Sequence, residues 1–273
     1  MDASPAPSPD VRRAGPPDAA HRALLLPGGL CSAEFYADVM ARPEPAAAGL
    51  GTVAVTLPGF GRTTPPADLS MENYARLMGE VAAAERCDVL VGHSMGANAA
   101  IEMAALGVFT GPLVLLSPTF CRADEAAFLG VLDRVGRVPG LGPLAWAAML
   151  RAVPRATAKE LVKAGVPAGR AAVLAADLGN NDPGFCRRVV RHYYDYLDRH
   201  RSLVPRLRDT GARTWVVRGA HDEIGLTDEE HRALSAAPHI TLATVPHAGH
   251  MLLVEQPAQV AALIAKSVQH LSP

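Results

Sequence analysis

Short runs of apolar residues that end in Gly, Pro or Ser alternate along this chain with longer segments rich in Ala and Leu. Such apolar runs are typical of strands buried on both faces of a parallel sheet, and the longer segments are typical of the helices that cover it. The predicted strands are 23–27, 52–57, 88–92, 113–116, 214–218 and 240–245, and the first predicted helices are 33–41, 71–86 and 95–106. The pattern predicts an α/β fold with a doubly wound, mainly parallel sheet of about six strands.

The segment 122–207 interrupts this alternation. It has helical patterns and Pro or Gly breaks, such as Val138-Pro139-Gly140, but no run typical of a strand. Residues 179–184 read GNNDPG, a concentration of residues that favour turns, and are expected to join two helices. We therefore predict an all-helical lid at 122–207, inserted after the fourth predicted strand into a core formed by 23–121 and 208–273.

Residues 1–22 are rich in Pro, Ala and Asp and lack the apolar centre of a secretory signal. They are interpreted as a flexible N-terminal tail. No apolar run approaches the roughly 20 residues that a membrane-spanning helix needs. This composition predicts neither a membrane protein nor a secreted one.

Charge and cysteine content exclude several classes of partner. The chain has 26 Lys and Arg against 27 Asp and Glu, so no net field attracts nucleic acid or an anionic membrane. The cysteines are widely spaced and form no CxxC pair, which fits neither a zinc site nor a disulfide framework. Reduced thiols in a cytoplasmic protein are the expectation for Cys31, Cys87, Cys121 and Cys186.

Residues 89–97 read VLVGHSMGA and place Ser94 where a predicted strand turns into a predicted helix. Gly92 and Gly96 suit this turn, because side chains there would collide with neighbouring backbone. The serine hydroxyl would then project from the carboxyl edge of the sheet. The start of the helix adds a positive dipole end and free N–H groups, which favour a developing oxyanion. The pattern predicts a nucleophilic serine.

A nucleophilic serine needs a base and an acid that orients it. His250 follows the last predicted strand in the stretch VPHAGHM, and is the candidate base. Asp222 follows the strand TWVVRG at the same sheet edge, and is the candidate acid. Both residues follow predicted strands, and the carboxyl ends of these strands are expected at the sheet edge that carries Ser94.

Three other residues are weighed for the same roles. Asp124, after the fourth predicted strand, is an alternative acid. His247 is an alternative base, although it lies nearer the end of its strand. His93 precedes the nucleophile directly and is interpreted as structural.

On these motifs the sequence resembles the α/β-hydrolase fold superfamily, in its lid-bearing serine hydrolase branch of esterases, lactonases and C–C hydrolases. The order Ser94, Asp222, His250 is the order in that superfamily, and LPGFG at 57–61 looks like its loop after the next strand. The likeness covers the chain from about residue 23 and is weakest in the lid.

The resemblance implies an oxyanion hole formed by the backbone N–H groups of Met95 and Gly29. Where the family commonly has His-Gly, this chain has Pro27-Gly28, which removes an imidazole but no required donor. Many relatives begin with an antiparallel hairpin, whereas only the Pro-rich tail precedes Ala23 here. A trimmed core of six parallel strands is therefore expected.

The expected activity is hydrolysis of a small or medium-sized apolar ester, lactone or thioester through an acyl-enzyme on Ser94. A serine at this position argues against dehalogenase and epoxide hydrolase chemistry, which uses an aspartate there. Two alternatives stay open: acyl transfer, cyclase, lyase or C–C hydrolase chemistry on the same fold, and a ligand-binding receptor with a nearly idle triad. No metal site or nucleotide-binding loop is found, so no cofactor is expected.

The lid contains aromatic residues that allow two interpretations: packing between the lid helices and the core, which we favour for most of them, or lining of a substrate cavity. They are Trp146, Tyr193, Tyr194 and Tyr196. The sequence gives no indication of the oligomeric state.

Overall fold

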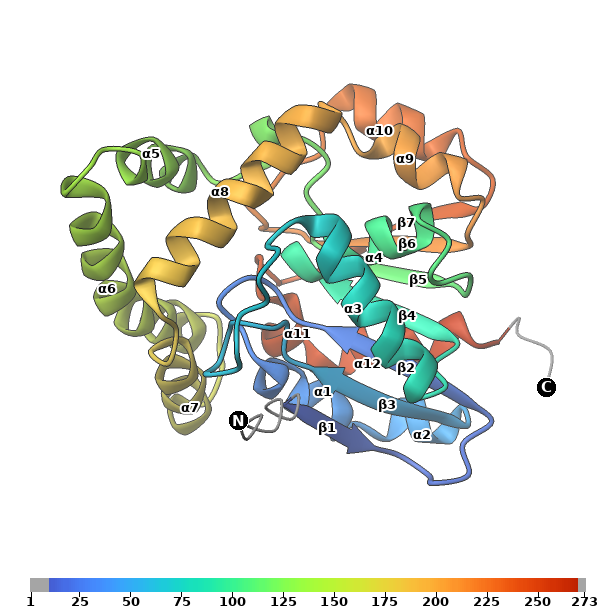
Figure 1. Cartoon of the computed structure of the whole chain (residues 1–273). Helices are drawn as coiled ribbons and strands as arrows, with labels where there is room; N and C mark the ends of the chain where they lie inside the picture. The colour runs from blue at the N-terminus through green and yellow to red at the C-terminus, as the bar shows by residue number, and fades with distance from the viewer. Residues whose placement is uncertain (1–9, 270–273) are drawn as a thin grey trace, which may run out of the picture.

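A seven-stranded sheet runs through the part of the chain that the computed structural model describes, residues 10–269 (Figure 1). Its strand order is β1-β3-β2-β4-β5-β6-β7, and every neighbouring pair is parallel except β1 with β3. The strands are β1 (Val11–Ala14), β2 (His21–Leu26), β3 (Leu50–Val55), β4 (Val89–His93), β5 (Leu113–Leu116), β6 (Thr214–Gly219) and β7 (Ile240–Val245).

Helices cover both faces of this sheet, as the apolar strands predict. All residues of β3, β4 and β5 are buried, which is why these strands have no polar face. One hydrophobic cluster joins the sheet to α3 (Met71–Ala84) and α4 (Met95–Ala105). A second cluster joins the other face to η1 (Ala33–Tyr36), α1 (Ala37–Met40), α11 (Leu252–Glu255) and α12 (Pro257–Ser267), and the short α2 (Pro43–Ala47) packs against α12.

The six predicted strands are present and parallel to one another, but the expectation that only a flexible tail at 1–22 precedes them is wrong for the described residues. Residues 11–14 form an antiparallel edge strand, and β2 begins at His21 rather than at Ala23. The strand escapes a search for apolar runs because its two central residues are exposed arginines, as edge strands commonly have. Arg12 pairs with Glu34 and Arg13 with Glu85. Residues 1–9 of the predicted tail lie outside the described part.

The segment between β5 and β6 contains helices joined by short loops and no strand, and its residues are all described. Asp182 caps α8 by accepting the Phe185 N–H at 2.6 Å, so the GNNDPG run does join two helices. The elements of this insertion are η2 (Arg122–Asp124), α5 (Ala127–Gly136), α6 (Leu141–Lys163), α7 (Ala168–Leu178), α8 (Pro183–His200) and α9 (Val204–Asp209). Whether the insertion acts as a lid stays a prediction.

Buried polar contacts hold the insertion to the core. Glu102 of α4 is fully buried and accepts hydrogen bonds from Arg206 of α9 at 2.6 and 2.5 Å. It also accepts the hydroxyl of Tyr196 of α8 at 2.9 Å. On the other side of the insertion, Arg170 of α7 donates to Asp38 of α1 at 2.6 Å. The insertion is therefore anchored to the helix that follows Ser94.

The four cysteines, all within residues 10–269, are free thiols. Over the same residues, no helix combines the length and the apolar character that crossing a membrane requires.

Candidate active site

Ser94 lies at the junction between β4 and α4, as the sequence predicts. It adopts φ 49° and ψ −121°, a conformation that a residue with a side chain rarely takes. Its N–H donates to Leu116 O at 2.9 Å, which ties the strained turn to the neighbouring strand β5. This is the geometry of a nucleophile elbow, in which a sharp turn between strand and helix presents the hydroxyl.

Two glycines make this turn possible. A Cβ on Gly92 would lie 2.3 Å from Gly96 O, and a Cβ on Gly96 would lie 2.3 Å from Leu26 O. Both distances are far below any real contact, so the backbone of β4, α4 and the end of β2 meets here without room for side chains. The flanking glycines of the motif are therefore required by packing.

The two predicted oxyanion donors belong to neighbouring backbone segments. Met95 occupies the first position of α4, where a helix leaves the N–H without an intrahelical acceptor. Gly29 lies in the loop after β2, and a Cβ on it would be 3.5 Å from Met95 Sδ. Cys31 N–H donates to Gly28 O at 3.2 Å, which closes a tight turn in this loop. The arrangement brings the two backbone segments together beside Ser94.

Asp222 and His250 are in direct contact, although 28 residues separate them. His250 Nδ1 lies 3.2 Å from Asp222 Oδ1, and the carboxylate is 1% exposed while the imidazole is 31% exposed. Asp222 Oδ1 also accepts the Ile224 N–H at 3.0 Å, which fixes the loop after β6. The structure brings together the candidate base and the candidate acid.

The surroundings of Asp222 keep it ionised. Burial alone would raise the pKa of this carboxyl, but the hydrogen bond and charge of His250, the neighbouring Ser117 hydroxyl and the Ile224 N–H outweigh it. The pKa of Asp222 is therefore below its ordinary value. An ionised Asp222 would orient the His250 imidazole and stabilise its cationic form.

No hydrogen bond joins the Ser94 hydroxyl to His250 among the contacts of residues 10–269. A catalytic hydrogen bond between serine and histidine often forms only when substrate is bound. His93 connects Ser94 and His250, because it is next to Ser94 in the sequence and contacts His250. It precedes Ser94, and its Nε2 lies 2.9 Å from His250 O while the two imidazole rings are 5.0 Å apart.

His93 is structural in the sense that the sequence suggests. It is 1% exposed, and burial followed by the charge of His250 lowers its pKa to about 3, so the imidazole is neutral. The Nε2–H therefore donates to His250 O, and Nδ1 is the unprotonated nitrogen. A Cβ on Gly28 would lie 2.9 Å from Nδ1, so this imidazole packs against the loop that carries Gly29.

The alternative acid Asp124 and the alternative base His247 have other surroundings. Both oxygens of Asp124 are occupied, because Oδ2 accepts the N–H groups of Phe120 and Cys121 at 2.9 Å and Oδ1 accepts Cys121 Sγ at 3.3 Å. Asp124 thus braces the loop after β5. His247 is exposed and adopts φ 57°, in the tight turn before His250.

Two residues near Asp222 were missed in the sequence. Ser117 directly follows β5, is fully buried and adopts φ 49°. Arg218 lies on β6, and its Nη2 is 3.9 Å from Asp222 Oδ2. A charged residue inside the apolar strand TWVVRG, four positions before Asp222, is the signal that could have revealed Arg218.

The four aromatic residues of the insertion that the sequence singles out are buried, which agrees with the packing interpretation, whereas Phe128 of α5 is exposed. The exposed fractions of the four run from 1% to 7%. Tyr193 also takes part in a polar contact, because its hydroxyl donates to Glu125 Oε1 at 2.7 Å. The residues concerned are Trp146, Tyr193, Tyr194 and Tyr196.

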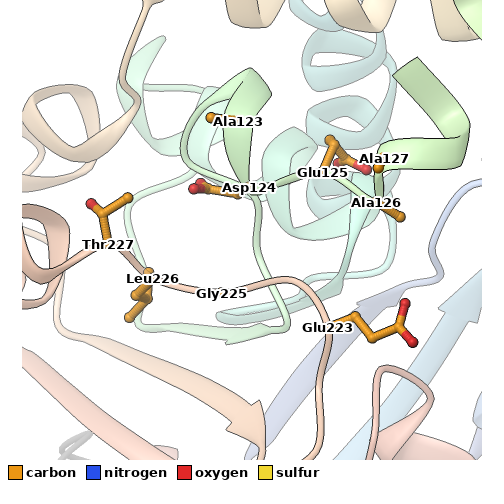
Figure 2. Close-up of a pocket in the computed structure, with 9 residues that line it drawn as sticks. All are labelled: Ala123, Asp124, Glu125, Ala126, Ala127, Glu223, Gly225, Leu226 and Thr227. Atoms are coloured by element: carbon orange, nitrogen blue, oxygen red, sulfur yellow. The ribbon is translucent and has the colours of Figure 1, made fainter. Parts of the chain in front are cut away.

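A cavity of about 400 Å³ opens beside this region, but neither Ser94 nor His250 lines it. Figure 2 shows that its lining comes from two segments, 123–127 and 223–227, which follow β5 and β6. Cys121, Asp124 and Glu230 lie close enough nearby to share a metal ion. The carboxylates of Asp124 and Glu230 already accept local hydrogen bonds. The positive charge of Arg218 acts on both of them and opposes metal binding.

Comparisons with known proteins agree with this fold. The model of the alpha/beta hydrolase family matches residues 23–263. A search of curated protein sequences found no match.

Solved structures with this fold include enzymes of several kinds. A thermophilic esterase from Thermogutta terrifontis has a TM-score of 0.70 and 18% identity, over 96% of this chain and 93% of that one. MenH from S. aureus has a TM-score of 0.71 and 17% identity, over 95% and 97%. The N-acyl homoserine lactonase AidH has a TM-score of 0.69 and 19% identity, over 95% and 93%. At these identities the likeness establishes the fold.

Proposed function

The chain belongs to the alpha/beta hydrolase family, and from this premise we propose that it is a cofactor-independent serine hydrolase with Ser94, His250 and Asp222 as its catalytic triad. The proposed substrate is a small or medium-sized apolar ester, lactone or thioester. Family membership alone does not choose a reaction, because this fold carries many chemistries. The residues at the carboxyl edge of the sheet have to carry the argument.

The proposed reaction has two steps. Ser94 Oγ attacks the substrate carbonyl while His250 Nε2 takes the hydroxyl proton, and the N–H groups of Met95 and Gly29 stabilise the oxyanion. His250 then gives the proton to the leaving alcohol or thiol. Water activated by His250 hydrolyses the acyl-enzyme, and Asp222 keeps the imidazole in the required tautomer throughout.

One observation supports the proposal above all others: the strained turn at Ser94, with φ 49° and ψ −121°. Strain of this kind persists only where the surrounding structure imposes it, and it concentrates at functional sites. Here Gly92 and Gly96 permit it, and the start of α4 directs unpaired N–H groups to the same place.

The substrate class is supported less directly. An esterase, a lactonase and a thioesterase domain are among the structures with this fold, and all three names describe attack on an acyl carbon. The insertion, rich in Ala, Leu and Val, suits an apolar acyl group.

The proposal is tested by turnover of three substrate series: p-nitrophenyl esters, N-acetylcysteamine thioesters and acyl homoserine lactones, each with acyl chains of two to ten carbons. We expect hydrolysis in at least one series, and loss of it in Ser94→Ala. Ser235→Ala, an exposed serine on α10 (Asp228–Ser235), is the matched control and is expected to retain the activity.

Product analysis separates the remaining alternatives. Free acid as the product supports hydrolysis, whereas transfer to an added alcohol or thiol in preference to water would replace it with acyl transfer. A folded protein that turns over no series, and that binds acyl compounds unchanged, would contradict the hydrolase proposal in favour of a receptor.

A further inference from the structure

Arg218 is a buried cation beside the proposed triad acid. The alternation of β6 places it on the same face as Val216, which packs in the cluster that contains α3 and α4. Its side chain is 12% exposed, so the guanidinium is largely removed from water. Burial lowers the pKa of Arg218, and Asp222, Asp124 and Glu230 oppose that shift. The guanidinium nonetheless stays charged at every ordinary pH.

The polar atoms of this group have few partners. Within residues 10–269, neither Nη1 nor Nη2 of Arg218 makes a hydrogen bond, although both nitrogens are buried. Asp222 Oδ2 is buried and makes no hydrogen bond of good geometry over the same range, although the buried Ser117 hydroxyl also lies beside this carboxylate. Unsatisfied buried atoms of opposite charge are costly apart, and these face each other across 3.9 Å.

The other carboxylates near Arg218 are already used. Asp124 of η2 accepts backbone N–H groups of its own loop, and Glu230 of α10 accepts the N–H and hydroxyl of Thr227. Of the carboxylates in the described part of the chain, Asp222 is the one within 4.0 Å of the guanidinium. Its two oxygens therefore lie between two groups, with Oδ1 toward His250 and Oδ2 toward Arg218.

We propose that Arg218 is a positioning residue: its guanidinium attracts Asp222 Oδ2 and so keeps Oδ1 directed at His250, and its positive charge sets the pH range in which the His250 imidazole works as a base. The inference rests on the proposed function of Ser94, Asp222 and His250. Arg218 touches no reacting atom, and its action passes through Asp222.

The direction of the effect follows from the charges. His250 faces Asp222, which favours the imidazolium, and the ring of the neutral His93. The positive charge of Arg218 offsets part of the negative charge that His250 senses. Removal of the guanidinium therefore favours the imidazolium and moves the acidic limb of the pH profile of the reaction to higher pH.

The test compares Arg218→Met, Arg218→Gln and Arg218→Lys with the wild type. The control is Arg213→Met, which removes an exposed arginine just before the opposite end of β6. The His250 imidazole is titrated by NMR in protein labelled with 13C-histidine, and its signal is assigned with His250→Gln. In parallel, the rate constant of fluorophosphonate labelling is measured from pH 4.5 to 9.

We expect Met or Gln at 218 to move the NMR titration curve of His250 and the acidic limb of the labelling profile to higher pH together. Lys at 218 is expected to restore both to the wild-type positions, because it keeps the positive charge, and Arg213→Met to leave both unchanged because its charge is exposed and screened. The Gln variant keeps the test open if Met disturbs the fold.

Unchanged titration of His250 in folded Met and Gln variants would overturn the role of Arg218, whatever the activity. A shift that Lys does not rescue would also overturn it, because the loss of the arginine side chain, and not of its charge, would then explain the shift. A His250 that shifts as expected in a protein whose serine is never labelled would contradict the proposed function instead. The two failures are therefore distinguishable.

Discussion

The Asp222→Asn variant examines the contact that joins the two halves of the proposed site. Asparagine keeps the size of the side chain and removes its charge, so the imidazolium formed during reaction loses its counter-ion. Asp222 is also the residue that the sequence placed second in the order Ser, acid, His. A large effect is expected on kcat, in addition to a loss of stability because the buried Arg218 guanidinium loses its counter-ion.

The magnitude follows from the geometry of the pair. Nδ1 and Oδ1 are 3.2 Å apart and the carboxylate is 1% exposed, while about a third of the imidazole faces solvent. At an effective dielectric constant of about 20, unit charges about 4 Å apart attract by about 4 kcal/mol, and solvent at His250 reduces this to about 3 to 4 kcal/mol. The expected loss in kcat is roughly 200- to 1,000-fold.

The assay is kcat on the ester or thioester that the wild type hydrolyses fastest, with urea unfolding to show that the variant is folded. Asp124→Asn is the matched control, because it makes the same change at the alternative acid. Asp124 braces backbone N–H groups, so this variant is expected to lose stability and retain kcat. The reasoning is refuted if folded Asp222→Asn keeps kcat within tenfold, or if Asp124→Asn loses as much.

Three further predictions concern the structure around the site. Gly96→Ala places a methyl group 2.3 Å from Leu26 O and is expected to destabilise the fold by about 3 kcal/mol or more in urea unfolding, whereas Gly130→Ala, in open space on α5, should be neutral or slightly stabilising. His93 has a folded-state pKa of about 3 against an ordinary 6.5, so its stabilisation is complete above pH 6.5 and is lost as pH falls toward 3. The free energy of unfolding should therefore fall by about 2 kcal/mol more in the wild type than in His93→Gln between pH 7 and pH 5, and equal slopes would contradict the neutral buried imidazole. Glu102→Gln breaks a buried ion pair to α9 and should cost about 2 to 4 kcal/mol, with a loss under 1 kcal/mol speaking against this anchor.

The core of the fold is predictable because its strands are buried on both faces. The runs at 113–116 and 240–245 coincide with β5 and β7, and the glycines around Ser94 mark the turn from β4 into α4. Strand β1 is not predictable in this way, since it is short, polar at its centre and held by pairing with β3. Its stability comes from partners distant in sequence, which a local pattern does not contain.

The same distinction applies to the site. Motifs at strand ends identify Ser94, Asp222 and His250 as candidates, because the carboxyl ends of parallel strands lie at the same edge of the sheet. The contact of Arg218 with Asp222 depends on which face of β6 each side chain occupies and on the depth of burial. That information appears only once the neighbouring loops are packed.

The central claim is that Ser94 is an activated nucleophile, and intact mass after incubation with a fluorophosphonate probe tests it most directly. The account predicts one adduct on the wild type, none on Ser94→Ala, and none on His250→Ala within the same time. No adduct on a folded wild type, or an adduct that persists in Ser94→Ala, would contradict it.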